Sequence, residues 1–191
     1  MFSGQHAERR SSGIGGTFIS ILVMVALVLG LSWGLRTFVF QAYEIPSGSM
    51  EETIQTGDMV FSEKISYYFT EPAQGDIVTF VDPEIPSRIL IKRVVAVGGQ
   101  TVDLVDGVVV VDGVALDEPY TNGRVSNPLT PAYGTSITYP FTVPAGSLWV
   151  MGDNRTNSQD SRYFGPIKSS SVTGKAALIY WPFTHFGLLA S

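Results

Sequence analysis

The pattern of apolar and polar residues divides the chain near residue 41. Residues 17–35 read TFISILVMVALVLGLSWGL and contain no charged side chain. As an α-helix this run would be about 28 Å long, close to the thickness of a bilayer's hydrocarbon core. Arg36 follows, and residues 37–40 are again apolar. Residues 17–40 are therefore predicted to form a transmembrane anchor that ends at the membrane interface.

Two other interpretations of this run fit less well. A cleavable signal peptide normally has an apolar core of about 7–15 residues that ends at small residues. Here the run is longer, and Phe40-Gln41-Ala42 places a bulky residue at the cleavage position. A helix of a soluble core is rarely apolar on every side in one small domain. We therefore favour an uncleaved anchor.

Charge gives a weak indication of the orientation of this anchor. Arg9 and Arg10, opposed by Glu8, give residues 1–16 a small positive excess, whereas Arg36 at the other end works against it. Because positive residues favour the cytoplasmic side, we expect a cytoplasmic tail at 1–16 and a large extracytoplasmic domain.

After Gln41 the pattern changes to short β-rich runs separated by turn residues. Residues 108–111 lie between Asp106-Gly107 and Asp112-Gly113, which is the composition of tight hairpin turns. No long helical period follows the anchor, so the predicted fold class is mainly β with one N-terminal transmembrane helix. The other predicted strands are residues 77–81, 89–97, 147–151 and 175–181.

Composition excludes several classes of function. The net charge of −5 argues against nucleic-acid binding. The chain has no cysteine, which excludes a thiol nucleophile, a disulfide framework and a cysteine-based zinc site. The two histidines, His6 and His185, lie in the N-terminal tail and in a C-terminal aromatic stretch. Neither position favours a Ser-His-Asp triad or a multi-histidine metal site.

Ser49 is the candidate nucleophile. It lies in the turn Pro46-Ser47-Gly48-Ser49-Met50, nine residues after Phe40. That tether reaches at most about 30 Å, so Ser49 is expected to work near the bilayer surface. A serine hydroxyl needs a base to become a nucleophile. Taken alone, the same residues are also ordinary turn chemistry.

Lys92 is the candidate base, because it interrupts the apolar run at 89–97. Burial lowers the pKa of a lysine, and the neutral amine can then accept a serine proton. The alternative is a lysine on the solvent face of an edge strand. In a strand, Lys92 and Arg93 point to opposite faces, so one of the two is expected in a special environment.

A dense polar loop at residues 152–162 follows the predicted strand 147–151. It is either a solvated surface turn or a set of side chains that fixes the geometry of another group.

Taken together, these motifs resemble those of bacterial type I signal peptidases, the membrane-bound Ser-Lys proteases also called leader peptidases. The resemblance extends from the anchor to the C-terminus, and the motifs follow the family's order. They are P-S-G-S-M at 46–50, G-D-I-V-x-F at 75–80, I-K-R-V-V at 91–95 and G-D-N-R-x-x-S-x-D-S-R at 152–162.

The resemblance implies a role for each matching residue. Ser49 would be the nucleophile and Lys92 the general base. The Ser47 hydroxyl and the Ser49 backbone N–H would form the oxyanion hole, and Ser158 would hydrogen-bond the Lys92 amine. Ile45, Met50 and Ile91 would line small apolar substrate pockets. The paired, loop-shaping residues would be Asp153, Arg155, Asp160 and Arg162.

The resemblance also implies a domain organisation and a set of partners. The β-rich Ser-Lys protease core would consist of residues 41–100 and 145–191, and an inserted β-cap would occupy residues 101–144. Substrates would be preproteins that carry signal peptides, and the other partner would be the lipid bilayer. No cofactor, metal or nucleic acid is expected.

Three departures from the family's usual pattern stand out. Glu51-Glu52 occurs where the family usually has a proline, Thr156 replaces a common acidic residue, and residues 97–100 read VGGQ. The first is expected to alter the substrate entrance.

Two alternative functions are open to this chain, a catalytically silent scaffold or binding module and a self-cleaving Ser-Lys protease. The retained Ser49, Lys92 and Ser158 argue against the first, and the anchor in place of a DNA-binding domain argues against the second.

Overall fold

The computed structural model describes residues 14–189, which fall into two units, one ending at Phe38 and one beginning at Val39. The first contains helix α1 (Ile14–Phe38), whose segment Gly15–Arg36 has a mean hydropathy of 2.4. Among the described residues it is the one helix long and apolar enough to cross a membrane. The helix includes all of the predicted run 17–35. Arg9 and Arg10, on which the predicted orientation rests, lie outside the described residues.

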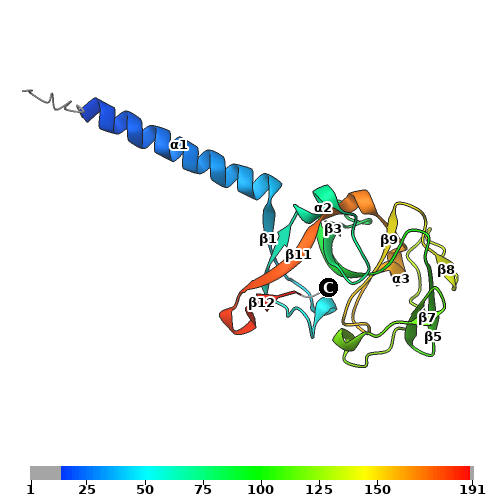
Figure 1. The fold of residues 1–191 in the computed structure, drawn as a ribbon. Coiled ribbons are helices and arrows are strands. Elements are labelled where there is room, and N and C mark those ends of the chain that lie inside the picture. The colour runs from blue at the N-terminus through cyan, green and yellow to red at the C-terminus, as the bar shows by residue number, and fades with distance from the viewer. Residues whose placement is uncertain (1–13, 190–191) are drawn as a thin grey trace, which may run out of the picture. The chain divides into compact units, whose positions relative to one another are not determined.

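The second unit is built mainly of antiparallel strands in two sheets (Figure 1). The larger sheet has the strand order β1-β2-β11-β3-β4-β9-β10, with β12 paired to β11. Its strands are β1 (Phe40–Glu44), β2 (Met59–Glu63), β3 (Ile77–Val81), β4 (Ile89–Val97), β9 (Ser147–Met151), β10 (Ile167–Lys168), β11 (Val172–Trp181) and β12 (Gly187–Leu188). The predicted class, mainly β with one N-terminal apolar helix, is confirmed.

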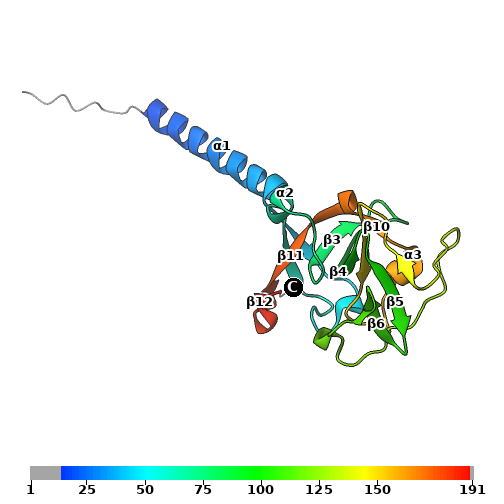
Figure 2. The ribbon, with the colours of Figure 1, turned by 45° about the vertical axis from the view of Figure 1, so that its right-hand side comes forward.

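The smaller sheet lies at one end of this unit, away from β1, β11 and β12 (Figure 2). Its strand order is β7-β6-β5-β8, and all its residues fall within the stretch predicted to be a cap. The turns at Asp106-Gly107 and Asp112-Gly113 have φ values of 51° and 81° and of 52° and 81°. Two successive positive φ angles define the predicted type of hairpin turn. The strands are β5 (Thr101–Val105), β6 (Val108–Val111), β7 (Val114–Ala115) and β8 (Phe141–Thr142).

Short helices connect the strands. Two are single α-helical turns, α2 (Ser66–Phe69) and α3 (Ser161–Phe164). Four are 3₁₀ turns: η1 (Gly48–Met50), η2 (Pro119–Thr121), η3 (Ser169–Ser171) and η4 (Phe183–His185). Residues 117–140, rich in Pro, Gly, Thr and Asn, form only one of these turns and no strand.

Strand β4 is central to the packing of the whole unit. Its first half pairs with β3, and its second half pairs with β9. Three apolar clusters meet along it, one containing Ile91, one Val95 and one Val94. This strand therefore holds the residues near Lys92 in a fixed register, because a shift of one residue would move every side chain to the opposite face.

Candidate active site

The Ser49 hydroxyl and the Lys92 amine lie against each other. Ser49 belongs to the turn η1, and Lys92 comes from β4. Lys92 Nζ lies 2.6 Å from Ser49 Oγ and 2.8 Å from the carbonyl oxygen of Ile91. Both residues are buried, with 8% of Ser49 and 3% of Lys92 exposed. The structure thus brings the predicted nucleophile and base into hydrogen-bonding contact.

Burial changes the protonation of Lys92. Loss of hydration lowers its pKa from 10.5 to about 8, because the charged ammonium is the form that burial disfavours. The nearby carboxylates of Asp160 and Asp153, and that of Asp82, oppose this by raising the pKa, whereas the Arg88 cation lowers it further. A useful fraction of the amine is therefore neutral near neutral pH and able to accept a proton.

The loop before Ser158 approaches the nucleophile turn closely. A Cβ atom added at Gly152 would lie 2.4 Å from the backbone oxygen of Ser49 and 2.3 Å from Ser158 Oγ. No side chain fits there without displacing the backbone, so this position requires glycine. Glycine in the G-D-N-R motif therefore allows the loop to pack directly behind Ser49.

The predicted hydrogen bond between Ser158 and Lys92 is absent from this structure. The Ser158 hydroxyl is buried and has no hydrogen-bond partner. Lys92 Nζ is already bonded to Ser49 Oγ and to Ile91 O, and Ser158 Oγ packs near Gly152. Ser158 nevertheless lines the same cleft of about 590 Å³ as Ser47, Ser49 and Lys92. Ser158 therefore lies in the cleft of the reactive pair, as expected, but without the expected hydrogen bond to Lys92.

The charged residues of the loop pair differently from the prediction. Arg162 and Asp160 form the expected pair, with two nitrogen-to-oxygen distances of 2.9 Å. Asp153 instead pairs with Arg93 of β4, at 2.9 and 2.8 Å.

Arg155 likewise pairs outside the loop, with Glu118, at 2.7 and 2.6 Å. Its partner precedes η2, in the stretch predicted to be the cap. Two of the four residues thus connect the loop to other segments, because their partners lie far along the chain.

Arg93 and Asn154 are further functional candidates, to which the sequence assigned no role. The Arg93 guanidinium also lies 3.9 Å from the centre of the Tyr120 ring. Asn154 donates its backbone N–H to Ser49 O at 3.1 Å and its side-chain amide to Gly48 O at 3.0 Å. It thereby fixes the backbone on both sides of the nucleophile. A basic residue on each face of β4 was the only sequence signal for Arg93, and both Lys92 and Arg93 are buried.

Glu51 and Glu52, which occur where the resembled family usually has a proline, form a turn beside the nucleophile. Glu51 has φ −54° and ψ 148°, Glu52 has φ 85°, and Thr53 N donates to Met50 O at 3.1 Å. These values describe a type II turn, in which the second central residue is usually glycine. The Glu52 carboxylate pairs with Arg124 at 2.7 Å.

The three residues expected to line substrate pockets pack together. Ile45, Met50 and Ile91 belong to one buried apolar cluster, which also contains Ile54, Val60, Ile77, Ala176 and Ile179. Ile45 lies four residues before Ser49, Met50 directly follows it, and Ile91 directly precedes Lys92. The cluster therefore lies immediately beside the reactive pair.

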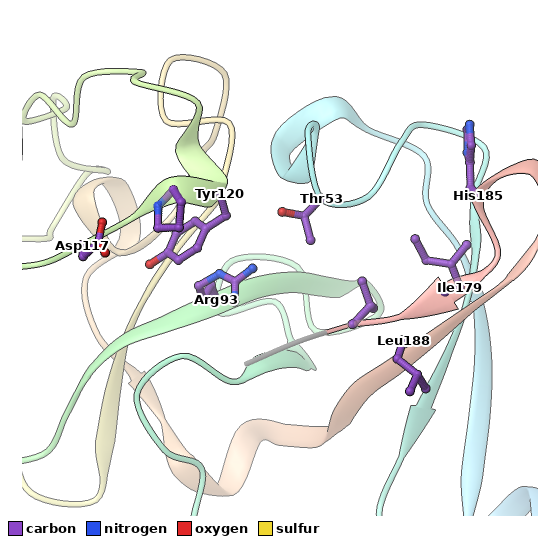
Figure 3. A pocket seen from close by; sticks show the side chains of 10 residues that line it. Thr53, Arg93, Asp117, Tyr120, Ile179, His185 and Leu188 are labelled. Carbon is purple, nitrogen blue, oxygen red and sulfur yellow. The ribbon is translucent and has the colours of Figure 1, made fainter.

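A second cleft, also about 590 Å³, lies on the other face of β4 (Figure 3). Arg93 and Tyr120 lie on one side of it, Ile179 and His185 on the other, and Thr53 between them. Lys92 and Arg93 line different clefts because neighbouring side chains of a strand point to opposite faces. His185 Nδ1 lies 2.7 Å from Asp58 Oδ1 and does not line the cleft of Ser49.

Comparisons with known proteins agree on one family. Residues 17–181 match the family described as signal peptidase, peptidase S26. A probable signal peptidase I-1 from Synechocystis sp. is 40% identical over 177 residues, covering 89% of this chain and 85% of the relative. A signal peptidase I from Leptolyngbya laminosa is 38% identical over 172 residues, covering 86% and 80%.

A crystal structure of a signal peptidase I from Enterococcus faecalis is 31% identical and covers 56% of this chain and 97% of that one, with a TM-score of 0.44. The family match covers well over half of the chain, and both relatives exceed 30% identity over most of their length. The chain belongs to the signal peptidase family, peptidase S26.

Proposed function

We propose that this protein is a membrane-anchored serine endopeptidase that removes signal peptides from preproteins, with Ser49 as nucleophile and Lys92 as general base. The observation that carries the proposal is the 2.6 Å contact between Lys92 Nζ and Ser49 Oγ in a buried site. The signal peptidase I names of the relatives support the same reaction.

The geometry supports a two-step acyl transfer. Neutral Lys92 takes the Ser49 proton as Oγ attacks the scissile carbonyl carbon. The resulting ammonium then donates a proton to the leaving amine, and the acyl group stays on Ser49. In the second step Lys92 takes a proton from a water molecule as the water oxygen attacks the acyl ester, and it returns that proton to Ser49 Oγ as the cleaved peptide leaves. Ser47, which lines the same cleft, and the Ser49 N–H would stabilise the oxyanion in both steps.

The free edge of β4 suits an extended substrate. Residues 89–92 of β4 pair with β3 on one side, and β9 pairs only from Arg93 onward. Among the described residues no strand covers the other edge at 89–92. A peptide that adds to this edge would place every second side chain on the face of Ile91. An A-x-A-like cleavage site has its small residues two apart, so both would point to the same face, which in this binding mode is the face of Ile91 and the apolar cluster.

The proposed topology places the N-terminus in the cytoplasm and residues 39–191 outside, with α1 as a single membrane pass in the lipid bilayer. The apolar helix Gly15–Arg36 supports the anchor, and the Arg9-Arg10 pair supports the orientation. No metal or other cofactor is required for this chemistry, since a lysine amine replaces the usual histidine base.

Cleavage of a preprotein by the detergent-solubilised full chain tests the proposal. We expect the parent protein to cut after an A-x-A site, and Ser49→Ala and Lys92→Met to cut at a background rate while remaining folded by circular dichroism. Equal cleavage by the parent and by Ser49→Ala would reject Ser49 as the nucleophile. A folded parent that leaves the preprotein intact would favour the silent-scaffold alternative.

A further inference from the structure

The last described residue of the chain packs against the apolar cluster beside the reactive pair. Strand β12 (Gly187–Leu188) pairs with Leu178 and Ile179 of β11. The next residue, Leu189, donates its backbone N–H to Ala177 O at 2.9 Å. Its side chain is partly buried and packs against the cluster that contains Ile45, Met50 and Ile91.

The neighbouring residue Leu188 borders the same cleft, but its side chain is directed outward. Its side chain is 85% exposed, and in Figure 3 it points away from Thr53 and the middle of the cleft. This alternation is expected for consecutive residues of an extended segment. Leu189 therefore packs inward as a consequence of the β12 register, which two pairings and the additional backbone hydrogen bond to Ala177 fix.

In the proposed binding mode the peptide backbone lies along the edge of β4 beside Ser49, and Leu189 lies on the face of β4 that would receive the two small side chains. Ile91 and Arg93 share one face of β4, and Arg93 lines the same cleft as Leu189. A peptide on the free edge of β4 would direct its two small side chains to that face. Any larger side chain would have to displace part of the cluster or the Leu189 side chain that packs against it.

We propose that Leu189 forms part of the wall of the apolar subsite and limits the size of the side chains accepted at the two small positions of the cleavage site. This inference rests on the proposed function. It assigns a specificity-determining role to a residue that lies 140 positions after Ser49 in the sequence. The pairing of β12 with β11 positions this residue beside the site.

A substitution pair on β12 and its extension tests this role. Full-length Leu189→Ala and Leu188→Ala are compared with the parent in detergent, on peptides with alanine, valine or leucine at either small position. The measured quantity is the kcat/KM ratio of each larger residue to alanine. One methylene in an apolar pocket changes such a ratio by roughly 10–200-fold, so Leu189→Ala should raise it at least about tenfold at one position. Leu188→Ala should keep the parent's ratio.

Because the readout is a ratio, a merely structural role gives a different result. A variant that is only less stable loses activity on all peptides in proportion and leaves the ratio unchanged, which would overturn the inference. Equal changes in Leu188→Ala and Leu189→Ala would overturn it as well. If Leu189→Ala does not fold, Leu189→Val shortens the side chain less and should raise the valine ratio in the same direction. Failure of the proposed function is separate, since the parent itself would then cut none of the peptides.

Discussion

The pH dependence of cleavage is the most direct test of Lys92 as the base. Lowering its pKa from 10.5 to about 8 corresponds to about 3 kcal/mol against the ammonium form. With a pKa of about 8, about one-tenth of Lys92 is neutral at pH 7, whereas an ordinary lysine would be neutral about 0.03% of the time. Burial thus increases the reactive fraction about 300-fold at that pH.

The assay is kcat/KM for an A-x-A peptide between pH 5.5 and 10, with the full chain in detergent. Since kcat/KM reports ionisations of the free enzyme, we expect it to rise about tenfold per pH unit and to level off above about pH 8. A midpoint at or above pH 10, or a rate that does not change between pH 6 and 9, would refute the reasoning.

A matched pair of charge substitutions extends this test. Arg88 lowers the pKa of Lys92, and Asp82, with which Arg88 pairs, raises it. Arg88→Gln removes a cation and frees a carboxylate, so both effects raise the pKa and move the midpoint upward. Lys168→Gln removes the same charge at an exposed position, outside the groups that act on Lys92, and should leave the midpoint in place. A downward shift in Arg88→Gln would contradict this account.

Four further predictions concern the protonation of Lys92, the turn at Glu52, the Ser47 hydroxyl and the Asn154 amide. Between pH 8 and 10.5 the folded state binds fewer protons at Lys92 than the unfolded state. The free energy of unfolding of the parent should therefore rise by about 3 kcal/mol relative to that of Lys92→Met across this window, measured by urea unfolding at several pH values. A difference that stays constant with pH would argue against this. Glu52→Gly should raise the free energy of unfolding by about 0.5–1 kcal/mol, because glycine adopts a left-handed backbone without strain. The comparison is made in an Arg124→Gln background, which removes the ion pair of Glu52 from both proteins. A loss of stability would show that φ 85° is not strained. Ser47→Ala should lower kcat by about 10²–10³ with little change in KM, since the Ser49 N–H remains; an unchanged kcat would exclude the hydroxyl from the oxyanion hole. Asn154→Ala should lower kcat up to about tenfold, because it loses the side-chain hydrogen bonds to Gly48 O and Glu51 Oε2 but keeps the backbone bond to Ser49 O. A change confined to KM would contradict this positioning role.

Local pattern was enough to predict much of the β-rich unit. The turns at Asp106-Gly107 and Asp112-Gly113 and strand β4 follow from residues next to each other in the sequence, and the structure has them at the predicted places. The predicted strand 175–181 is longer in the structure and begins at Val172, where register shifts interrupt its pairing. Irregular pairing of this kind depends on the neighbouring strands, so the sequence of β11 alone does not reveal it.

In the candidate site, too, contacts between residues far apart in the sequence could not be predicted from local pattern. Ser49 and Lys92 are 43 positions apart, so local spacing does not predict their contact, and the expectation came from the family resemblance. The partners of Asp153 and Arg155 lie 60 and 37 residues away, and no local spacing identifies them. The expected hydrogen bond from Ser158 to Lys92 is absent for another reason. Ser158 lines the cleft of the reactive pair, but the orientation of its hydroxyl depends on packing around Gly152, which the sequence alone does not reveal.

Strand β4 also restricts how this enzyme could change its length. Residues 91, 92 and 93 contribute in turn to the apolar cluster, to the reactive pair and to the ion pair with Asp153. One residue inserted directly before Lys92 would turn Lys92 to the face of Arg93 and Arg93 to the face of Lys92, so that the lysine no longer faced Ser49, unless a bulge absorbed the insertion. The exposed connection at 83–88, outside the paired region, can change length without that exchange. Insertions and deletions that retain activity are therefore expected in that connection and not within the strand.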